Sequence, residues 1–535
     1  MTEPTQVLGA ASGAVRSRET AGRLALAAIL GVAHTQAFAP HTWWWLQLLS
    51  LAGLCALLAR APRPRDAAAT GYAFGLGWFL SGIWWLYISM HVYGEMPAWM
   101  ASLAVLLFAL YLSLYPALAA AAWHWLGTRL RPPARAAPAV PTAAAALLLP
   151  LAFGALWGLS EWLRGVVFTG FPWLSGGYAH TDGPLAGYAP LVGVYGIGAL
   201  SAACAALLTA AAGTLGAGRD GRRTGLVALA SALALPLAGA ALVPLAWTQP
   251  AGQPIRVRLL QGNVPQDMKF EPVGVQRSLE LYRDLITAAP TDLVVTPETA
   301  FPLILQDLPV DIAIAIRDYV QHSGSTVLFG AAGADSPTDF TNSVFGLGPE
   351  TAQLYRYNKH HLVPFGEFIP FGFHWFVNMM KMPLGDFRRG GLDQPALPVH
   401  GIHVAPNICY EDLFGEEIAQ TLRDQAVPAN VLANVTNLAW FGDTIALDQH
   451  LQISRMRALE TRRPMLRATN TGMTAVVLPD GTVAQRLPTF TVGTLVATVQ
   501  GMQGLTPYVR WGNAPLLTAC LALALLAFWR ARRRA

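Results

Sequence analysis

A lone cysteine stands at the end of an apolar run and shortly before two acidic residues, in the stretch VAPNICYED at residues 404–412. The apolar run predicts a strand, and Glu411 and Asp412 predict the first turn of a helix that follows it. A thiol at such a turn lies near backbone N–H groups, which favour the thiolate. Cys409 is therefore a candidate nucleophile, and a buried structural cysteine at a strand end is the alternative interpretation.

Charged residues that could work with this thiol follow two other short strands. Glu298 comes directly after an apolar run at 293–296, and Lys359 and Glu367 lie in the stretch YRYNKHHLVPFGEFIP. In α/β proteins, ligands bind where strands end. A carboxylate base, a cation and a thiol form a coherent set for nucleophilic catalysis. Each charge taken singly could also be a solvated loop residue.

The rest of the chain is typical of a membrane protein. Of its 535 residues 53% are hydrophobic and 13% are charged, whereas soluble proteins have about 25% charged residues. Crossing the bilayer takes about 20 apolar helical residues. Eight stretches qualify as expected spans: 24–40, 43–59, 71–92, 99–126, 142–163, 187–213, 225–247 and 513–529.

The spans divide the chain into three parts. Residues 1–253 form an expected membrane domain with seven spans, and 254–507 have the composition of one globular domain. Residues 508–535 contain the eighth span and a basic tail. Arginines cluster between or beside the spans on one side only, which the positive-inside rule assigns to the cytoplasm. The globular domain is therefore expected on the opposite face.

The charge and the cysteines follow the same division. Residues 254–507 carry 18 Lys+Arg and 24 Asp+Glu, while the remainder carries 18 and 7. The basic residues thus serve as anchors beside anionic lipid and give no reason to expect a nucleic-acid partner.

Three of the four cysteines lie in expected spans and leave Cys409 unpaired in the exported domain, so no disulfide framework is expected there. Because HExxH and CxxC patterns are missing, we expect no metal and no cofactor.

Several longer motifs resemble known families. Glu298, Lys359 and Cys409, each after its own strand, resemble the Glu-Lys-Cys triad of the nitrilase (carbon-nitrogen hydrolase) superfamily. The whole chain resembles the apolipoprotein N-acyltransferase family, through QGNVPQDMKF, TPETAFP, YNKHHLVPFGEFIP, PNICYEDLF, NVTNLAWFGD, RALETRRPMLRATNTG and SEWLRGVVFTGFPW. One position departs from the family pattern, since Phe270 stands where the family usually has Trp.

This resemblance implies a polytopic α-helical bundle of eight spans and an exported nitrilase-like αββα sandwich. It implies a multi-pass protein of the bacterial inner membrane whose catalytic domain faces the periplasm. The implied reaction moves a fatty acyl chain from a phospholipid, such as phosphatidylethanolamine, through a cysteine thioester to the α-amino group of the S-diacylglyceryl cysteine of an apolipoprotein. The implied partners are the phospholipid donor, the apolipoprotein acceptor and the bilayer, and we expect a monomer.

The resemblance also implies roles. Glu298 acts as the base, Cys409 attacks the ester, and Lys359 with backbone N–H groups stabilises the oxyanion, which leads to ping-pong kinetics. Glu367 is expected to orient Lys359. Tyr410 and Glu411 are expected to support the nucleophile from its two neighbouring positions.

Further residues are expected to contact substrate. Phe270 and Trp440 are candidates by motif, and the Phe- and Met-rich segment 364–387 is predicted to be a lid that dips toward lipid, with Phe371, Trp375 and Met380 as its contacts. The alternative is a long loop packed on the domain's own core.

A last candidate lies in the membrane part. Arg164 stands three residues after Glu161, so either an ion pair between them or a contact with the phospholipid headgroup is expected.

Two other function classes stay open. A membrane-tethered amidase or nitrilase would share the triad and release the acyl group to water. A receptor or transporter would need ionisable residues along its spans, and these spans are nearly free of charge.

Overall fold

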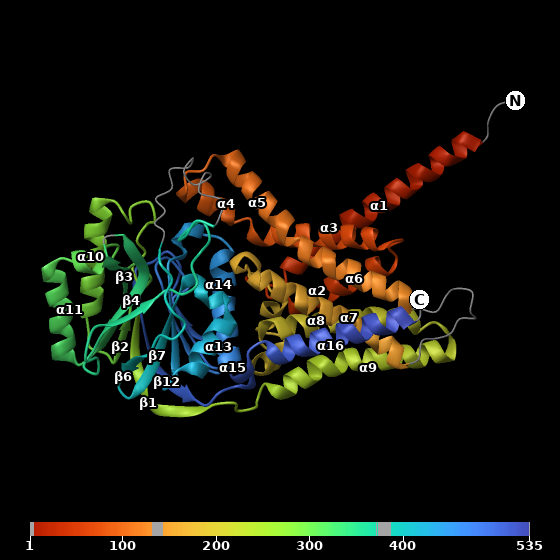
Figure 1. Cartoon of the computed structure of the whole chain (residues 1–535). Helices are drawn as coiled ribbons and strands as arrows, with labels where there is room; N and C mark the ends of the chain where they lie inside the picture. The colour runs from red at the N-terminus through yellow and green to blue at the C-terminus, as the bar shows by residue number, and fades with distance from the viewer. Residues whose placement is uncertain (1–4, 131–142, 337, 371, 373–386, 534–535) are drawn as a thin grey trace.

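The computed structural model describes residues 5–130, 143–336, 338–370, 372 and 387–533. A helical part is built from the first half of the chain and the last helix, and an α/β domain is inserted between α9 (Gly218–Leu242) and α16 (Ala514–Arg533). Figure 1 shows the two parts side by side, and both ends of the α/β domain connect to the helical part on the same side.

Helices occupy all of the expected apolar stretches. Among the described residues, four helical stretches are long and apolar enough to cross a membrane, or five if the bent pair Pro64–Ile83 and Leu86–Tyr93 counts as one span. This number does not establish eight spans, because α2 is short and other expected spans do not reach the same criteria. The remaining helices of this part are α1 (Thr5–Thr35), α2 (Trp44–Ala59), α3 (Pro64–Ile83), α4 (Leu86–Ile88), α5 (Ala98–Leu112), α6 (Leu114–Leu130), α7 (Ala143–Val166) and α8 (Ala189–Thr214).

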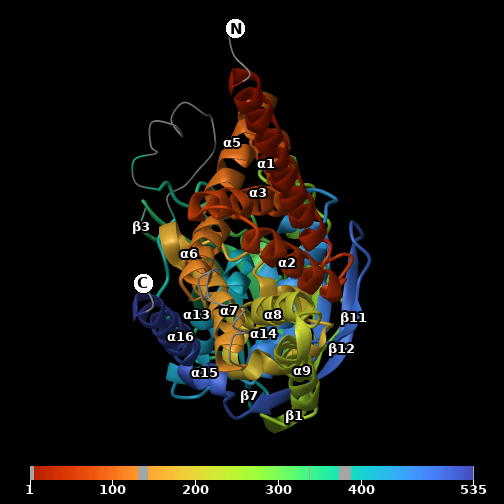
Figure 2. The same cartoon turned by 90° about the vertical axis from the view of Figure 1, so that its right-hand side faces the viewer.

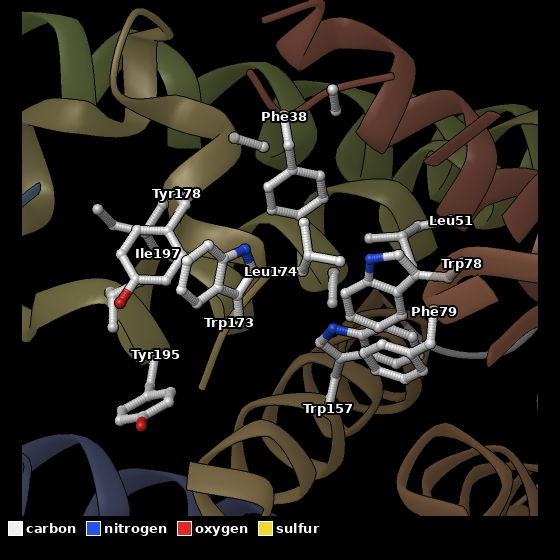
Figure 3. Close-up of a cluster of buried hydrophobic side chains, with 14 of the residues drawn as sticks. Phe38, Leu51, Trp78, Phe79, Trp157, Trp173, Leu174, Tyr178, Tyr195 and Ile197 are labelled. Atoms are coloured by element: carbon white, nitrogen blue, oxygen red, sulfur yellow. The ribbon is translucent and has the colours of Figure 1, made fainter. Parts of the chain in front are cut away.

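Aromatic side chains fill the centre of the helical part. Trp78 stacks on Phe79 with ring centroids 4.5 Å apart and on Trp157 at 6.0 Å. Figure 3 shows this group together with Trp173 and Tyr178. Buried side chains of the α/β domain belong to the same core, so the two parts share one apolar interior.

The α/β domain contains two six-stranded sheets. Their strand orders are β12-β1-β2-β3-β4-β5 and β11-β10-β9-β8-β7-β6. In each sheet three consecutive strands run parallel, β1-β2-β3 in one and β7-β8-β9 in the other. The bounds are β1 Gln249–Gln261, β2 Leu293–Val295, β3 Thr326–Ser336, β4 Asp339–Leu347, β5 Tyr355–Asn358, β6 Leu397–Val399, β7 Ile402–Ile408, β8 Val431–Thr436, β9 Met465–Thr469, β10 Ala475–Val477, β11 Val483–Arg486 and β12 Gly493–Gln503.

Successive side chains of a strand face opposite sides of its sheet, so each sheet packs on the other sheet with one face and on helices with the other, which gives four layers. In β2, Leu293 and Val295 face the second sheet, while Val294 faces helices α10 (Pro272–Thr287) and α11 (Val310–Ser323). In β8, Leu432 faces helices α13 (Gly415–Asp424) and α14 (Ala446–Thr461) instead. The expected αββα sandwich is therefore present in the described chain.

Helix α14 joins the sandwich to the helical part. One of its faces packs on the second sheet, and its other face, with Ile453 and Met456, belongs to the core of the helical part. Gln449 accepts hydrogen bonds from the indoles of Trp85 at 3.2 Å and Trp173 at 2.8 Å. Figure 2, viewed from the side of the helical part, shows α7, α8 and α9 in front of α14.

Candidate active site

The three candidate catalytic residues lie just beyond the ends of three strands. Glu298 follows β2, Lys359 is the residue after β5, and Cys409 is the residue after β7. Lys359 and the carboxylates are buried, with 1% of Lys359, 7% of Glu298 and 8% of Glu367 exposed. Because β2 and β5 belong to one sheet and β7 to the other, the site spans both halves of the sandwich.

Lys359 lies between two carboxylates. Its Nζ is 2.9 Å from Oε1 of Glu367 and 3.5 Å from Oε1 of Glu298. The side-chain amide of Asn342 donates to the same two oxygens, at 2.7 Å each. Burial acts to lower the pKa of Lys359, but the negative charges of Glu367 and Glu298 outweigh it, so the pKa lies above its ordinary value. The lysine therefore stays protonated across the physiological range.

The second oxygen of each carboxylate is held by a backbone donor. Oε2 of Glu298 accepts from the N–H of Asn437 at 3.0 Å, and Oε2 of Glu367 accepts from the N–H of Val363 at 2.8 Å. Each carboxylate thus has one oxygen toward Lys359 and one fixed to the backbone. This arrangement fits the expectation that Glu367 orients Lys359.

Cys409 has an uncommon backbone conformation. Its φ is +52°, in the left-handed region, and its side chain is half-buried. Non-glycine residues held there are concentrated at active sites, as in the strand-to-helix turn that presents a nucleophile in α/β hydrolases. The sharp turn after β7 therefore presents the sulfur at the strand end.

The structure around Cys409 contradicts the expectation that the start of an α-helix favours its thiolate. The acids do not open an α-helix, because residues Cys409–Leu413 form a 3-10 helix and α13 begins only at Gly415. Burial raises the pKa of the thiol to about 12, and the charge of Glu298 adds to the effect, while Lys359 and Thr436 act in the opposite direction. The resting sulfur is a thiol, so nucleophilic attack needs a base.

Glu411 ties the nucleophile turn to the Lys359 loop. Its carboxylate accepts from the backbone N–H of Ile408 and of His360, each at 2.6 Å, and from the hydroxyl of Tyr357 at 3.0 Å. Only 3% of the residue is exposed. Its position therefore supports both Cys409 and Lys359 rather than reaching substrate.

Tyr410 and Arg164 both bind backbone carbonyls of the loop that follows α7 in the helical part. The hydroxyl of Tyr410 donates to the carbonyl of Gly170 at 2.9 Å. Arg164 is 1% exposed and donates to the carbonyls of Phe171 at 2.5 Å and Trp173 at 2.7 Å. Its guanidinium holds the loop after α7, and within the described residues no ion pair joins it to Glu161, while the headgroup contact stays a prediction.

The candidate substrate residues are more scattered. Phe270 is 61% exposed, and Trp440 is 37% exposed with its ring 6.2 Å from that of Tyr93 in the helical part. Phe371, Trp375 and Met380 lie outside the described residues. The lid therefore stays a prediction.

Sequence reasoning missed Lys269, although it lies in the motif that drew attention to Phe270. Lys269 is 2% exposed, and its Nζ donates to the carbonyl of Glu298 at 3.2 Å. One signal was available: the chain has only three lysines, at positions 269, 359 and 381, against many arginines.

Comparison with known families matches both parts of the chain. A model of the apolipoprotein N-acyltransferase N-terminal domain matches residues 30–207, and a carbon-nitrogen hydrolase model matches residues 256–508. An amidase of the nitrilase superfamily from Nesterenkonia AN1 is 20% identical over 50% of this chain and 98% of its own, with a TM-score of 0.37. Residues 256–508 are thus a carbon-nitrogen hydrolase domain.

Curated relatives extend over nearly the whole chain. An apolipoprotein N-acyltransferase of Ralstonia nicotianae is 67% identical over 95% of this chain and 93% of its own length. Enzymes of the same name from Chromobacterium violaceum and Nitrosomonas europaea are 45% and 43% identical, over 95% and 94% of this chain and 95% and 96% of their own lengths. The chain belongs to the apolipoprotein N-acyltransferase family and is an acyltransferase.

Proposed function

We propose that the protein transfers a fatty acyl chain from a phospholipid of the phosphatidylethanolamine type to the α-amino group of the S-diacylglyceryl cysteine at the N-terminus of apolipoproteins. The family supports lipoprotein N-acylation. One observation carries the chemistry: Lys359 is buried between Glu298 and Glu367, and Cys409 is presented at positive φ at the end of β7.

Acylation begins with the thiol proton. Glu298 takes it, and Sγ of Cys409 attacks the ester carbonyl of the phospholipid. Lys359 and backbone N–H groups stabilise the oxyanion, a contribution of about 2.7–4 kcal/mol for one good donor. The intermediate then expels the alkoxide, Glu298 returns the proton to it, and a lysophospholipid leaves. The acyl chain remains on Cys409 as a thioester.

Transfer uses the same groups. Glu298 takes a proton from the acceptor amine, whose nitrogen attacks the thioester carbonyl. The intermediate expels the thiolate of Cys409, which regains its proton from Glu298, and the product amide leaves. Because the first product departs before the second substrate reacts, ping-pong kinetics are expected.

We further propose eight spans in the bacterial inner membrane, with the carbon-nitrogen hydrolase domain on the periplasmic face. Both substrates carry acyl chains, and pulling them into water would cost about 0.8 kcal/mol per CH₂ group. The contact of α14 with the helical part, and the position of Trp440 beside Tyr93, support a site held close to the bilayer. A single copy of the chain provides all the groups named above.

Intact mass measurement tests the proposal. The purified full-length protein is incubated with phosphatidylethanolamine, and then with a diacylglyceryl-cysteine peptide, beside Cys409→Ala as the matched control. We expect a fatty-acyl increment on Cys409 that hydroxylamine removes and that passes to the peptide amine. If the adduct decays in water and ignores the peptide, the chain is a membrane-tethered hydrolase. If phospholipid gives no adduct, the proposed donor is wrong.

A further inference from the structure

Two of the three lysines in the chain lie buried around Glu298. Lys359 and Lys269 are 1% and 2% exposed, although lysine is almost never fully buried unless it is paired. Apart from Lys381, the other Lys and Arg positions of this chain are all arginines, including every cluster beside the expected spans. Lysine carries a compact ammonium that can shift its pKa, whereas arginine stays charged in all conditions. The distribution therefore concentrates the buried ammonium groups of the described chain at this site.

Lys269 is locked to Glu298 from two directions. Its Nζ donates to the Glu298 carbonyl, and its own N–H binds the carbonyl of Gln266 at 3.4 Å. The side chain of Gln266 accepts from the amide of Asn437 at 2.7 Å, and the backbone N–H of Asn437 in turn holds Oε2 of Glu298. The loop that carries Lys269 therefore closes a ring of contacts around the candidate base.

The ammonium of Lys269 has more hydrogen-bond donors than acceptors around it in the described part of the chain. It carries three N–H donors, and in the described part of the chain one acceptor lies within hydrogen-bond distance of Nζ. A buried cation with so little hydrogen bonding is costly unless negative charge lies close by. The charged groups that act on it are Glu298 and, when ionised, Cys409.

Lys269 adds a second positive charge beside the carboxylate of Glu298. Glu298 and Glu367 bring two negative charges, and Lys359 brings one positive charge between them. When Glu298 takes the thiol proton, the negative charge moves from its carboxylate to the sulfur. A second fixed ammonium beside both groups would favour each of these states.

We propose that Lys269 is a second cation of the catalytic centre, which holds the Glu298 turn in place and stabilises the Cys409 thiolate as it forms. This role rests on the proposed use of Cys409 as nucleophile. Lys269 acts through Glu298 and the sulfur, so it is a positioning residue, and it keeps its proton throughout the transfer.

Alkylation of Cys409 by iodoacetamide measures this role without phospholipid or peptide. The full-length protein is labelled in detergent over a range of pH, and labelling at Cys409 is followed by mass spectrometry, with Cys409→Ala as the background. The variants are Lys269→Met, which removes the charge at similar length, and Lys269→Arg, which keeps it. We expect Lys269→Met to lower the rate about tenfold at pH 7, the equivalent of one pKa unit, while Lys269→Arg retains most of the rate.

The wild-type pH profile gives a second readout that needs no variant. Burial lowers the pKa of Lys269 to about 8, against the raising effect of Glu298 and of the Cys409 thiolate. Below that pH the ammonium supports the thiolate, and above it the support is lost. The alkylation rate should therefore rise less steeply above about pH 8 in the wild type, and with constant slope in Lys269→Met.

Equal rates and equal slopes in the wild type and Lys269→Met, with unchanged thermal unfolding, would overturn the proposal and leave Lys269 a structural residue. Lys269→Gln can still donate to the Glu298 carbonyl but carries no charge, so a wild-type alkylation rate in that variant would also overturn the proposal. If Lys269→Met does not fold, Lys269→Gln takes its place in the alkylation assay and is judged by the same outcomes. None of these results depends on whether the thioester reaction occurs, so failure here is distinct from failure of the proposed function.

Discussion

Two buried groups of charges in this protein use different cations. In the catalytic centre the cations are lysines, and Lys359 faces two carboxylates at once. At the junction with the helical part the cation is Arg457, which pairs with Glu460 at 3.0 Å, and neither side chain is exposed. An arginine keeps its charge and direction, whereas a lysine can share its charge among partners that gain and lose protons.

The two groups also differ in what the carboxylates hold. Oε1 of Glu460 accepts from the N–H of Val194 at 2.8 Å, directly after Gly193, where φ of +64° breaks α8. The Arg457–Glu460 pair therefore fixes α8 of the helical part to α14. In the catalytic centre, Glu298 and Glu367 bind Lys359, Asn342 and the backbone N–H groups of Asn437 and Val363, all within the α/β domain. One group assembles the two parts, and the other is arranged for reaction.

The strongest test of this difference removes the junction cation. Arg457→Met leaves Glu460 buried without its partner, so we expect the free energy of unfolding to fall by about 3–5 kcal/mol. Acyl transfer per folded molecule should change little. Thermal unfolding in detergent and activity normalised to folded protein measure the two effects.

Arg455 provides a matched control on the same helix. Its pair with Asp182 is partly exposed, so Arg455→Met should cost no more than about 1 kcal/mol. Equal losses in both variants would mean that burial of the pair does not set its importance.

The next largest effect concerns the catalytic cation. Lys359→Met removes an oxyanion donor, and we expect acyl-enzyme formation to slow by about 10²–10³-fold, or about 2.7–4 kcal/mol. Lys359→Arg should not restore the rate, because the planar guanidinium cannot take the place of a compact ammonium between Glu298 and Glu367. Single-turnover acylation followed by mass spectrometry measures both variants. If Lys359→Arg were fully active, the catalytic centre would not need lysine, and the proposed difference from the Arg457–Glu460 junction would be wrong.

A smaller effect is expected at Tyr410, where the α/β domain contacts the helical part. Tyr410→Phe loses the hydrogen bond to Gly170, a net contribution of about 1 kcal/mol, so kcat/KM should fall by up to about tenfold if the bond positions Cys409. Tyr355→Phe is the control, since its hydroxyl also donates to a backbone carbonyl, that of Pro395, away from the helical part. A comparable loss of activity in both variants would argue against a specific link through Tyr410.

The smallest effect is expected at Phe270. Because its ring is 61% exposed, Phe270→Trp should change the free energy of unfolding by less than about 0.5 kcal/mol. Acylation should be unchanged, since no contact joins this ring to the described Glu298–Lys359 group. Separate measurement of acylation and of transfer to the peptide checks this, and a faster transfer step would show that the indole contributes to acceptor binding.

The positions of the main candidates could be predicted from the sequence because each lies just beyond the end of a strand. The apolar runs that end before Glu298 and at Ile408 became β2 and β7. Lys269 could not be found in this way, since its burial depends on loops that carry Glu298 and Asn437, far along the chain. The expected α-helix start at Glu411 was wrong for a similar reason: its oxygens turn back to the N–H groups of Ile408 and His360, and α13 begins only at Gly415.

The pairing of β1 with β12 has a consequence for the order of folding. These strands run antiparallel from Gln249 opposite Gln503 to Gln261 opposite Gly493, and they are the first and last strands of the α/β domain. The first sheet therefore cannot be completed until residue 503 has left the ribosome, and until then β1 remains an unpaired edge of that sheet. Such distant pairing makes folding slow. The acyltransferase domain is thus expected to become competent only after the start of α16 has been synthesised, which ties its maturation to insertion of the last helix.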